Sequence, residues 1–97
     1  MAKLTCLDSV SRWISEQTAQ HPEIFFFINK LKVMIESKPE NGLDDPILSI
    51  KGKTIPCRKQ SVSLYLFPHQ HAIGYDHITA TYVYNNADVA ILKMIYT

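Results

Sequence analysis

Apolar and polar positions alternate most clearly in the last third of the chain. Two runs, Ile78–Tyr84 and Val89–Tyr96, have the period of two that is typical of β-strands, and Asn85-Asn86-Ala87-Asp88 separates them with turn residues. The pattern therefore predicts a β-hairpin. Both of its faces are largely apolar, which favours central strands that are covered on two sides. In the second run, strict alternation groups Val89, Ile91, Lys93 and Ile95 against Ala90, Leu92, Met94 and Tyr96.

The first third of the chain has the spacing of α-helices instead. Apolar residues three and four positions apart predict a first helix over Ser9–Gln20, which follows a good N-cap residue, Asp8. A second helix is predicted over Pro22–Ser37, because proline is tolerated in the first helical turn. Pro39 stops this second helix.

The remaining segments complete an α+β order. Lys3–Leu7 reads as a short strand, and Val62–Phe67 alternates as a strand does. Glu40–Pro46 is expected to be a polar loop, whereas Ile47–Pro56 fits either a short strand or irregular packing. The order strand, helix, helix, three strands predicts a single domain over residues 1–97, with a helix pair packed on a three-stranded, mainly antiparallel sheet that ends in the hairpin.

Composition adds little to this outline until the charges are located. The 97 residues carry ten basic and nine acidic side chains, a formal charge of +1, which gives no general preference for nucleic acid or membrane. The cations are nevertheless clustered, since a segment without any acid holds Lys51, Lys53, Arg58 and Lys59. Such a run forms either a solvated loop or a local phosphate site.

Two cysteines, Cys6 and Cys57, are too few for a disulfide framework. No segment approaches the roughly 20 apolar residues that a membrane-spanning helix requires. We therefore expect a cytoplasmic protein with reduced thiols and no membrane association.

Three histidines, His69, His71 and His77, lie just before or inside the predicted hairpin. In an extended chain, His69 and His71 share one face and can chelate a metal if His77 or Asp76 supplies a third ligand. Solvated surface histidines are the plainer interpretation. Proton transfer is the third, because imidazole titrates near neutral pH.

Cleavage of RNA by its own 2′-hydroxyl group needs a base, a cation beside the phosphate, and an acid for the leaving 5′-oxygen. The histidines suit either proton-transfer role, and the basic segment suits the phosphate. Tyr75 or Tyr96 can stack on a base or orient the substrate. These residue types are common, so their presence alone does not select this chemistry.

The run Phe25-Phe26-Phe27 in the second predicted helix cannot place all of its rings in one core. Phe25 and Phe26 are therefore candidates for a surface that binds a protein partner.

The element order and the hairpin together resemble the RelE/ParE toxin superfamily. Leu92-Lys93-Met94-Ile95-Tyr96 is similar to the closing half of that family's hairpin, with lysine where arginine is usual, and Ile50-Lys51-Gly52 looks like its Leu-Lys-Gly turn. Many members are ribosome-dependent mRNA endonucleases that use metal-independent acid–base chemistry, and others act on gyrase. An antitoxin that wraps around the fold inhibits each of them. The usual arginine at the head of the hairpin is replaced here by His77 or Thr79.

Two functional hypotheses follow. In the first, the chain is a toxin-like endoribonuclease without cofactor or metal, whose partners are an antitoxin, mRNA and the ribosome. The resemblance then implies catalytic roles for His69, His71, His77 and Tyr96, and phosphate binding by Lys51, Lys53, Arg58, Lys59 and Lys93. In the second, it is a non-enzymatic interaction module that binds an inhibited or regulated protein through Phe25 and Phe26.

Overall fold

The structure, a computed structural model, describes residues 3–44, 48–50, 53–65 and 73–97. The chain order of its elements is β1 (Lys3–Cys6), α1 (Asp8–Gln20), α2 (Ile24–Ser37), the 3₁₀-helix η1 (Pro39–Asn41), β2 (Leu43–Asp44), β3 (Leu48–Ile50), β4 (Lys53–Ile55), β5 (Arg58–Ser63), β6 (His77–Tyr84) and β7 (Asp88–Tyr96).

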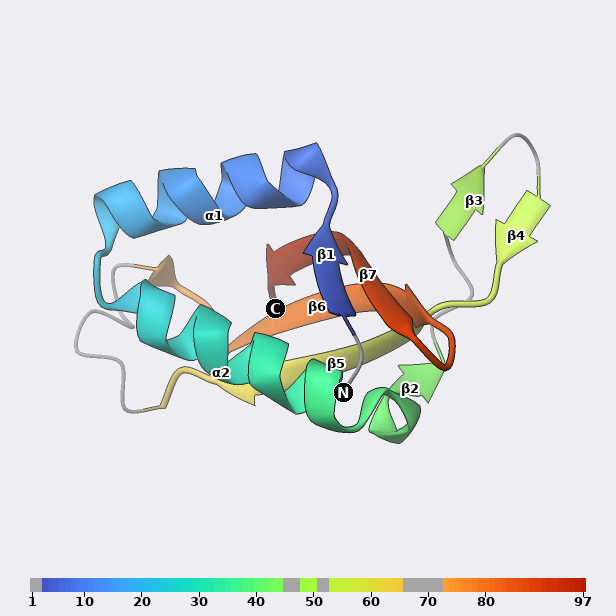
Figure 1. The fold of residues 1–97 in the computed structure, drawn as a ribbon. Coiled ribbons are helices and arrows are strands. Elements are labelled where there is room, and N and C mark those ends of the chain that lie inside the picture. The colour runs from blue at the N-terminus through green and yellow to red at the C-terminus, as the bar shows by residue number, and fades with distance from the viewer. Residues whose placement is uncertain (1–2, 45–47, 51–52, 66–72) are drawn as a thin grey trace.

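Five of the strands form one mixed sheet, in the order β1-β7-β6-β5-β2. β1 runs parallel to β7, and every other pair in this sheet is antiparallel. Both α-helices lie on one side of the sheet, α1 near β1 and β7 and α2 across β5 and β6 (Figure 1). β3 and β4 form a separate hairpin that projects from one end of the molecule (Figure 1).

A single hydrophobic core fills the space between the helices and one face of the sheet. α2 contributes the buried residues Ile24, Ile28, Leu31 and Ile35, whose spacing of three and four keeps them on one helical face. The sheet contributes Val62, Leu64, Ile78, Ala80, Tyr82, Val89, Ile91 and Met94. On β5 and β6 these are alternate residues, so the residues between them belong to the opposite face.

The predicted α+β class is confirmed, although the sheet has five strands and is mixed rather than three-stranded. The strand predicted over Val62–Phe67 begins earlier in the structure, at Arg58, and β5 ends at Ser63; residues 66 and 67 lie outside the described residues. The polar run Arg58-Lys59-Gln60-Ser61 has weak β-propensity, and it is extended here because it pairs with β6.

The hairpin prediction is confirmed, with each strand one residue longer at its start. The strict alternation predicted for its second strand is wrong, because the register shifts between Thr81 and Tyr82 and leaves Leu92 as an extra residue. Ile91 therefore faces the core, whereas Lys93 faces the opposite side. Coverage on both faces is also wrong for the described residues, because the helices cover only one face (Figure 1).

The segment after α2 forms more structure than a polar loop. Leu43 and Asp44 pair with Lys59 and Arg58 as β2. The alternatives left open for Ile47–Pro56 resolve into the β3–β4 hairpin, whose connecting residues 51 and 52 lie outside the described residues.

Three side chains of the sheet hold the segment after α2 in place. The Tyr82 hydroxyl group donates a hydrogen bond to the Pro39 carbonyl at 2.5 Å. Gln60 Nε2 donates to the Lys38 carbonyl at 2.9 Å and to Tyr82 Oη at 3.0 Å. Arg58 Nη1 donates to the Gly42 carbonyl at 2.9 Å. We call Arg58, Gln60 and Tyr82 the polar clamp.

Replacing Gly42 by alanine tests how closely this segment approaches the clamp. A Cβ atom at Gly42 would collide with the Tyr82 hydroxyl group and lie 2.9 Å from Arg58 Cβ. We expect Gly42→Ala to lower the free energy of unfolding by about 1–3 kcal/mol, because backbone or clamp must shift. Urea unfolding, monitored by the fluorescence of Trp13, measures this free energy. Asn41→Ala, at an exposed neighbour, is the control; equal stability of the two variants would contradict the close approach.

Candidate functional site

The face of the sheet that the helices leave uncovered carries most of the polar side chains of β5, β6 and β7. We define the open face as the residues that alternate with the core residues along these strands and therefore lie on the side away from the helices: Lys59, Ser61, Ser63, His77, Thr79, Thr81, Lys93, Ile95 and Thr97. These side chains come from three adjacent strands, so an extended ligand that lies on the face can contact all three.

Two lysines flank a threonine in one row of the open face. The strand register places Lys59 opposite Thr81 and Thr81 opposite Lys93. Adjacent strands are about 4.8 Å apart, so the two lysine backbones are about 10 Å apart. Thr81 is only 4% exposed although it lies on this face. The row is a pair of cations with a hydroxyl-bearing residue between them, and it is the basic part of the face.

Hydroxyl groups lie beside this row. Ser61 Oγ and Thr79 Oγ1 are 2.7 Å apart, and Thr79 Oγ1 and Thr97 Oγ1 are 2.8 Å apart. These hydrogen bonds connect β5, β6 and the residue after β7. Hydroxyl groups of this kind both donate and accept hydrogen bonds, so they suit phosphate and ribose oxygens.

His77 stands at the other end of the open face from the lysines. It is the first residue of β6, its backbone exchanges hydrogen bonds with Thr97 at 3.1 and 2.9 Å, and its side chain is exposed. It lies four positions before Thr81, which corresponds to about 13 Å along the strand. His77 and the two lysines therefore contact different parts of a bound ligand.

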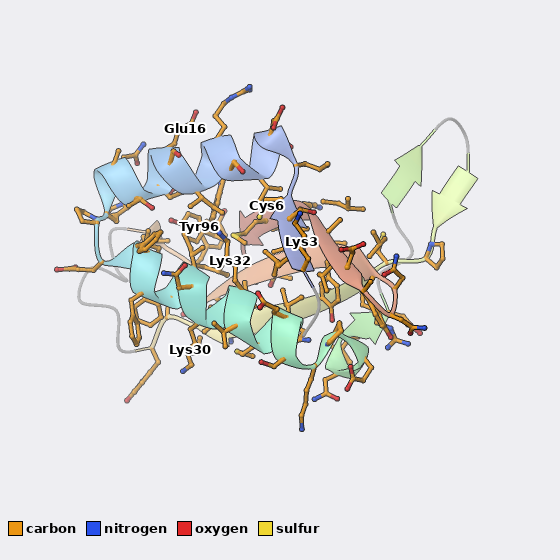
Figure 2. All side chains as sticks on the ribbon, viewed as in Figure 1. Lys3, Cys6, Glu16, Lys30, Lys32 and Tyr96 are labelled. Atoms are coloured by element: carbon orange, nitrogen blue, oxygen red, sulfur yellow. The ribbon has the colours of Figure 1, made fainter. Side chains whose placement is uncertain are left out.

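Tyr96 lies on the core side of the sheet and not beside His77. It pairs with the core residue Ile78, and its hydroxyl group donates to Gln17 Oε1 at 2.8 Å. Its ring lies 5.0 Å from that of Trp13 and stacks on Tyr75 at 5.9 Å. Figure 2 shows it between α1 and the sheet. Burial raises the pKa of Tyr96 above its usual value of 10.0. These contacts are those of a packing residue.

Arg58 is likewise separated from the open face. As part of the polar clamp it donates to the carbonyls of Gly42 and Glu40, and its Nη1 lies 3.9 Å from Asp44 Oδ1. Its guanidinium group also lies 5.8 Å from the centre of the Tyr84 ring. The donors of Arg58 are thus directed to the protein itself.

The other predicted site residues lie elsewhere. Lys53 begins β4, outside the main sheet, and Lys51, His69 and His71 lie outside the described residues. Phe25 and Phe26 are both exposed, but successive helical residues point about 100° apart. Phe26 instead shares a stripe with Val33, seven positions later; the two side chains are 69% and 61% exposed.

Within the described ranges, no three His, Cys, Asp or Glu side chains are arranged to hold a metal ion. Cys6 and Cys57 form no disulfide bond. Neither α1 nor α2 has the length and apolar character needed to cross a bilayer, and no other described helix does.

Comparison of the chain with protein-family models, curated proteins and solved structures gave no match. The candidate site therefore rests on the geometry of the open face.

Sequence reasoning named Lys59, Lys93 and His77, but it missed the hydroxyl-bearing residues between them. A signal was present, because Thr79 and Thr81 interrupt an otherwise apolar strand at alternate positions. Their relation to the lysines depends on the strand register, which the bulge at Leu92 alters.

The raised pKa of Tyr96 leads to a prediction about the stability of the protein at alkaline pH. Because its pKa is raised in the folded state, the unfolded chain loses this proton first. The stabilisation that the protonated Tyr96 hydroxyl group contributes to the folded state is complete below about pH 10, and it is lost as the pH rises through the pKa of the folded state. We expect the free energy of unfolding to fall above about pH 10, and Tyr96→Phe to make that fall shallower. Urea unfolding at several pH values measures it. Tyr65→Phe, at an exposed ring, is the control, and an unchanged slope in Tyr96→Phe would refute the assignment.

Proposed function

We propose that this protein is an RNA-directed endonuclease of the RelE/ParE toxin kind, and that single-stranded RNA lies along the open face. The observation that carries the proposal is the row Lys59, Thr81 and Lys93, which shares a face with His77. The α+β class is confirmed, and the likeness to this family stays a prediction.

The lysine row suits the sugar–phosphate backbone. Phosphate contacts supply most of the affinity of proteins for nucleic acid, and lysine ammonium groups make such contacts as point charges. The hydroxyl groups of Ser61, Thr79 and Thr97 suit the 2′-hydroxyl groups that distinguish RNA from DNA.

His77 is the described residue best suited to proton transfer. In the proposed reaction, the 2′-oxygen attacks the adjacent phosphorus atom and loses its proton to a base, and the leaving 5′-oxygen gains a proton from an acid. A proton-transfer group must lie within about 3 Å of the atom it serves. Since His77 is about 13 Å from the lysine row, it acts on one phosphate while the lysines hold others.

A second function has its own supporting observation. The exposed stripe of Phe26 and Val33 on α2 is apolar, as is typical of a protein-binding surface. It lies on the helical layer, away from the open face. An interaction module would bind through Phe26 and would not depend on His77 or Lys59, so substitutions at these positions separate the two functions.

The catalytic role of His77 is tested by substitution. We expect the wild-type chain to arrest growth when expressed and to cleave mRNA on ribosomes. His77→Ala should slow cleavage roughly 10²- to 10⁴-fold, the usual contribution of one acid–base group, and should relieve the arrest. RNA affinity should change little, since the lysines remain.

Single-turnover cleavage of a labelled RNA measures the rate, and His21→Ala, at the junction of α1 and α2, is the matched histidine control. Full cleavage by a folded His77→Ala protein would exclude His77, and absence of cleavage by the wild type would exclude the enzyme.

RNA binding by the lysine row is tested through salt dependence. We expect Lys59→Gln and Lys93→Gln each to weaken binding of a short single-stranded RNA, because each substitution removes a cation that neutralises a phosphate. The slope of log affinity against log salt should become shallower by about 0.7 for each phosphate that is no longer neutralised. Fluorescence anisotropy over a salt series measures both quantities.

The matched control is Lys30→Gln, because Lys30 is an exposed lysine on α2, on the helical side of the sheet (Figure 2). An equal loss of affinity in Lys30→Gln would show that binding follows overall charge and not the open face.

A further inference from the structure

The outer edge of β5 is paired over only part of its length. β2 covers Arg58 and Lys59, and no described strand pairs with residues 60–63 on that side. The Leu64 amide donates a hydrogen bond to the Asp76 carbonyl. In an antiparallel pair the direction of the backbone groups alternates, so Leu64, Val62 and Gln60 direct their N–H and C=O groups toward β6. Ser61 and Ser63 therefore direct their backbone N–H and C=O groups outward. These four groups have no backbone partner among the described residues.

This edge lacks the features that usually prevent strand pairing. Proteins protect such edges with lysine, proline, a bulge or a covering element. Residues 60–63, Gln-Ser-Val-Ser, contain no charge and no proline, and β5 pairs with β6 without a register shift. At the opposite edge of the sheet, by contrast, β1 begins with the exposed Lys3.

Two exposed apolar side chains mark the ends of the free edge. Leu43, at the end where β2 pairs, is 70% exposed, and Tyr65, just beyond β5, is 80% exposed. A groove beside the strand is lined by Met34, Asn41, Leu43, Lys59, Gln60 and Ser61. The free edge is thus a short strand surface with an apolar group at each end.

We propose that the β5 edge binds the β5 edge of a second copy of this chain, in antiparallel orientation about a two-fold axis at Val62. Ser61 then pairs with the partner's Ser63, and Ser63 with the partner's Ser61, so all four outward backbone groups of each copy are satisfied. An isologous contact requires such a self-complementary surface.

The ends of the two strands also match in this arrangement. The two-fold axis brings Tyr65 of each copy to Leu43 of the other, because these residues bracket the free edge at opposite ends. No like charges meet along the ladder, since residues 60–63 carry no charge and Lys59 is paired with Leu43 of its own chain. Two strongly exposed apolar side chains, Tyr65 and Leu43, are thereby covered.

A partner with an unrelated extended segment would use the same edge, but it would not require the match between Leu43 and Tyr65. The matched length and ends favour a second copy. The ladder is short, so this dimer should be weak. It should dissociate at concentrations at which dimers with larger interfaces remain associated.

The test is the mass in solution as a function of concentration. Sedimentation equilibrium of the intact protein should show a reversible increase from 11.1 kDa toward twice that mass. Ser61→Pro removes one outward N–H from each copy, and proline is tolerated on an edge strand, so dimerisation should weaken at least about 10-fold. Ser61→Ala keeps the N–H group and should dimerise like the wild type.

If Ser61→Pro does not fold, Tyr65→Ser and Leu43→Ser decide the question, because both side chains are exposed in the monomer. Each should weaken the dimer, whereas Val33→Ser, an equally apolar exposed site on α2, should not. A wild-type protein that stays at 11.1 kDa at all concentrations overturns the proposal. So does a dimer that tolerates Ser61→Pro, or one that is lost only in Val33→Ser.

Discussion

The hydrogen bond from the buried Tyr82 hydroxyl group to the Pro39 carbonyl is the contact on which the arrangement of this fold depends. It lies between the middle of the sheet and the end of α2, where a polar group without a partner would be costly. Gln60 and Arg58 extend it to the carbonyls of Lys38 and Gly42. Together they set the position of α2 over β5, and they bring β2 to the sheet edge. The close approach leaves no room for a side chain at Gly42.

The clamp also decides which cations are available for ligands. Alternation along β5 turns Arg58 and Gln60 toward the helical layer, where their donors are used within the protein. Lys59, between them, is turned to the open face. Two adjacent basic residues thus have different roles, one structural and one free to meet a phosphate in the proposed function. The same reasoning separates Tyr96, which packs on Trp13, from His77, which starts the neighbouring strand on the other face.

The two proposals concern different surfaces that meet at β5. The face of this strand carries Lys59 and its hydroxyl-bearing neighbours, while its edge presents Ser61 and Ser63 to a second copy. Pairing of two edges would continue the sheet from one copy into the next and join their open faces. An RNA strand could then extend from one copy to the other, but neither proposal requires the other, because backbone pairing and phosphate binding use different groups.

Local periodicity was enough to determine the two helices, the terminal hairpin and the α+β class, because apolar spacing of 3.6 or 2 residues reports directly which face is buried. His77, Lys59 and Lys93 were also visible as candidates from their residue types. Only tertiary structure decided which of them share a face. The bulge at Leu92 reverses the faces predicted for half of β7, and pairing with β6 makes a strand of the polar run at Arg58. Both effects come from contacts between residues distant in sequence, and a local pattern carries no information about register.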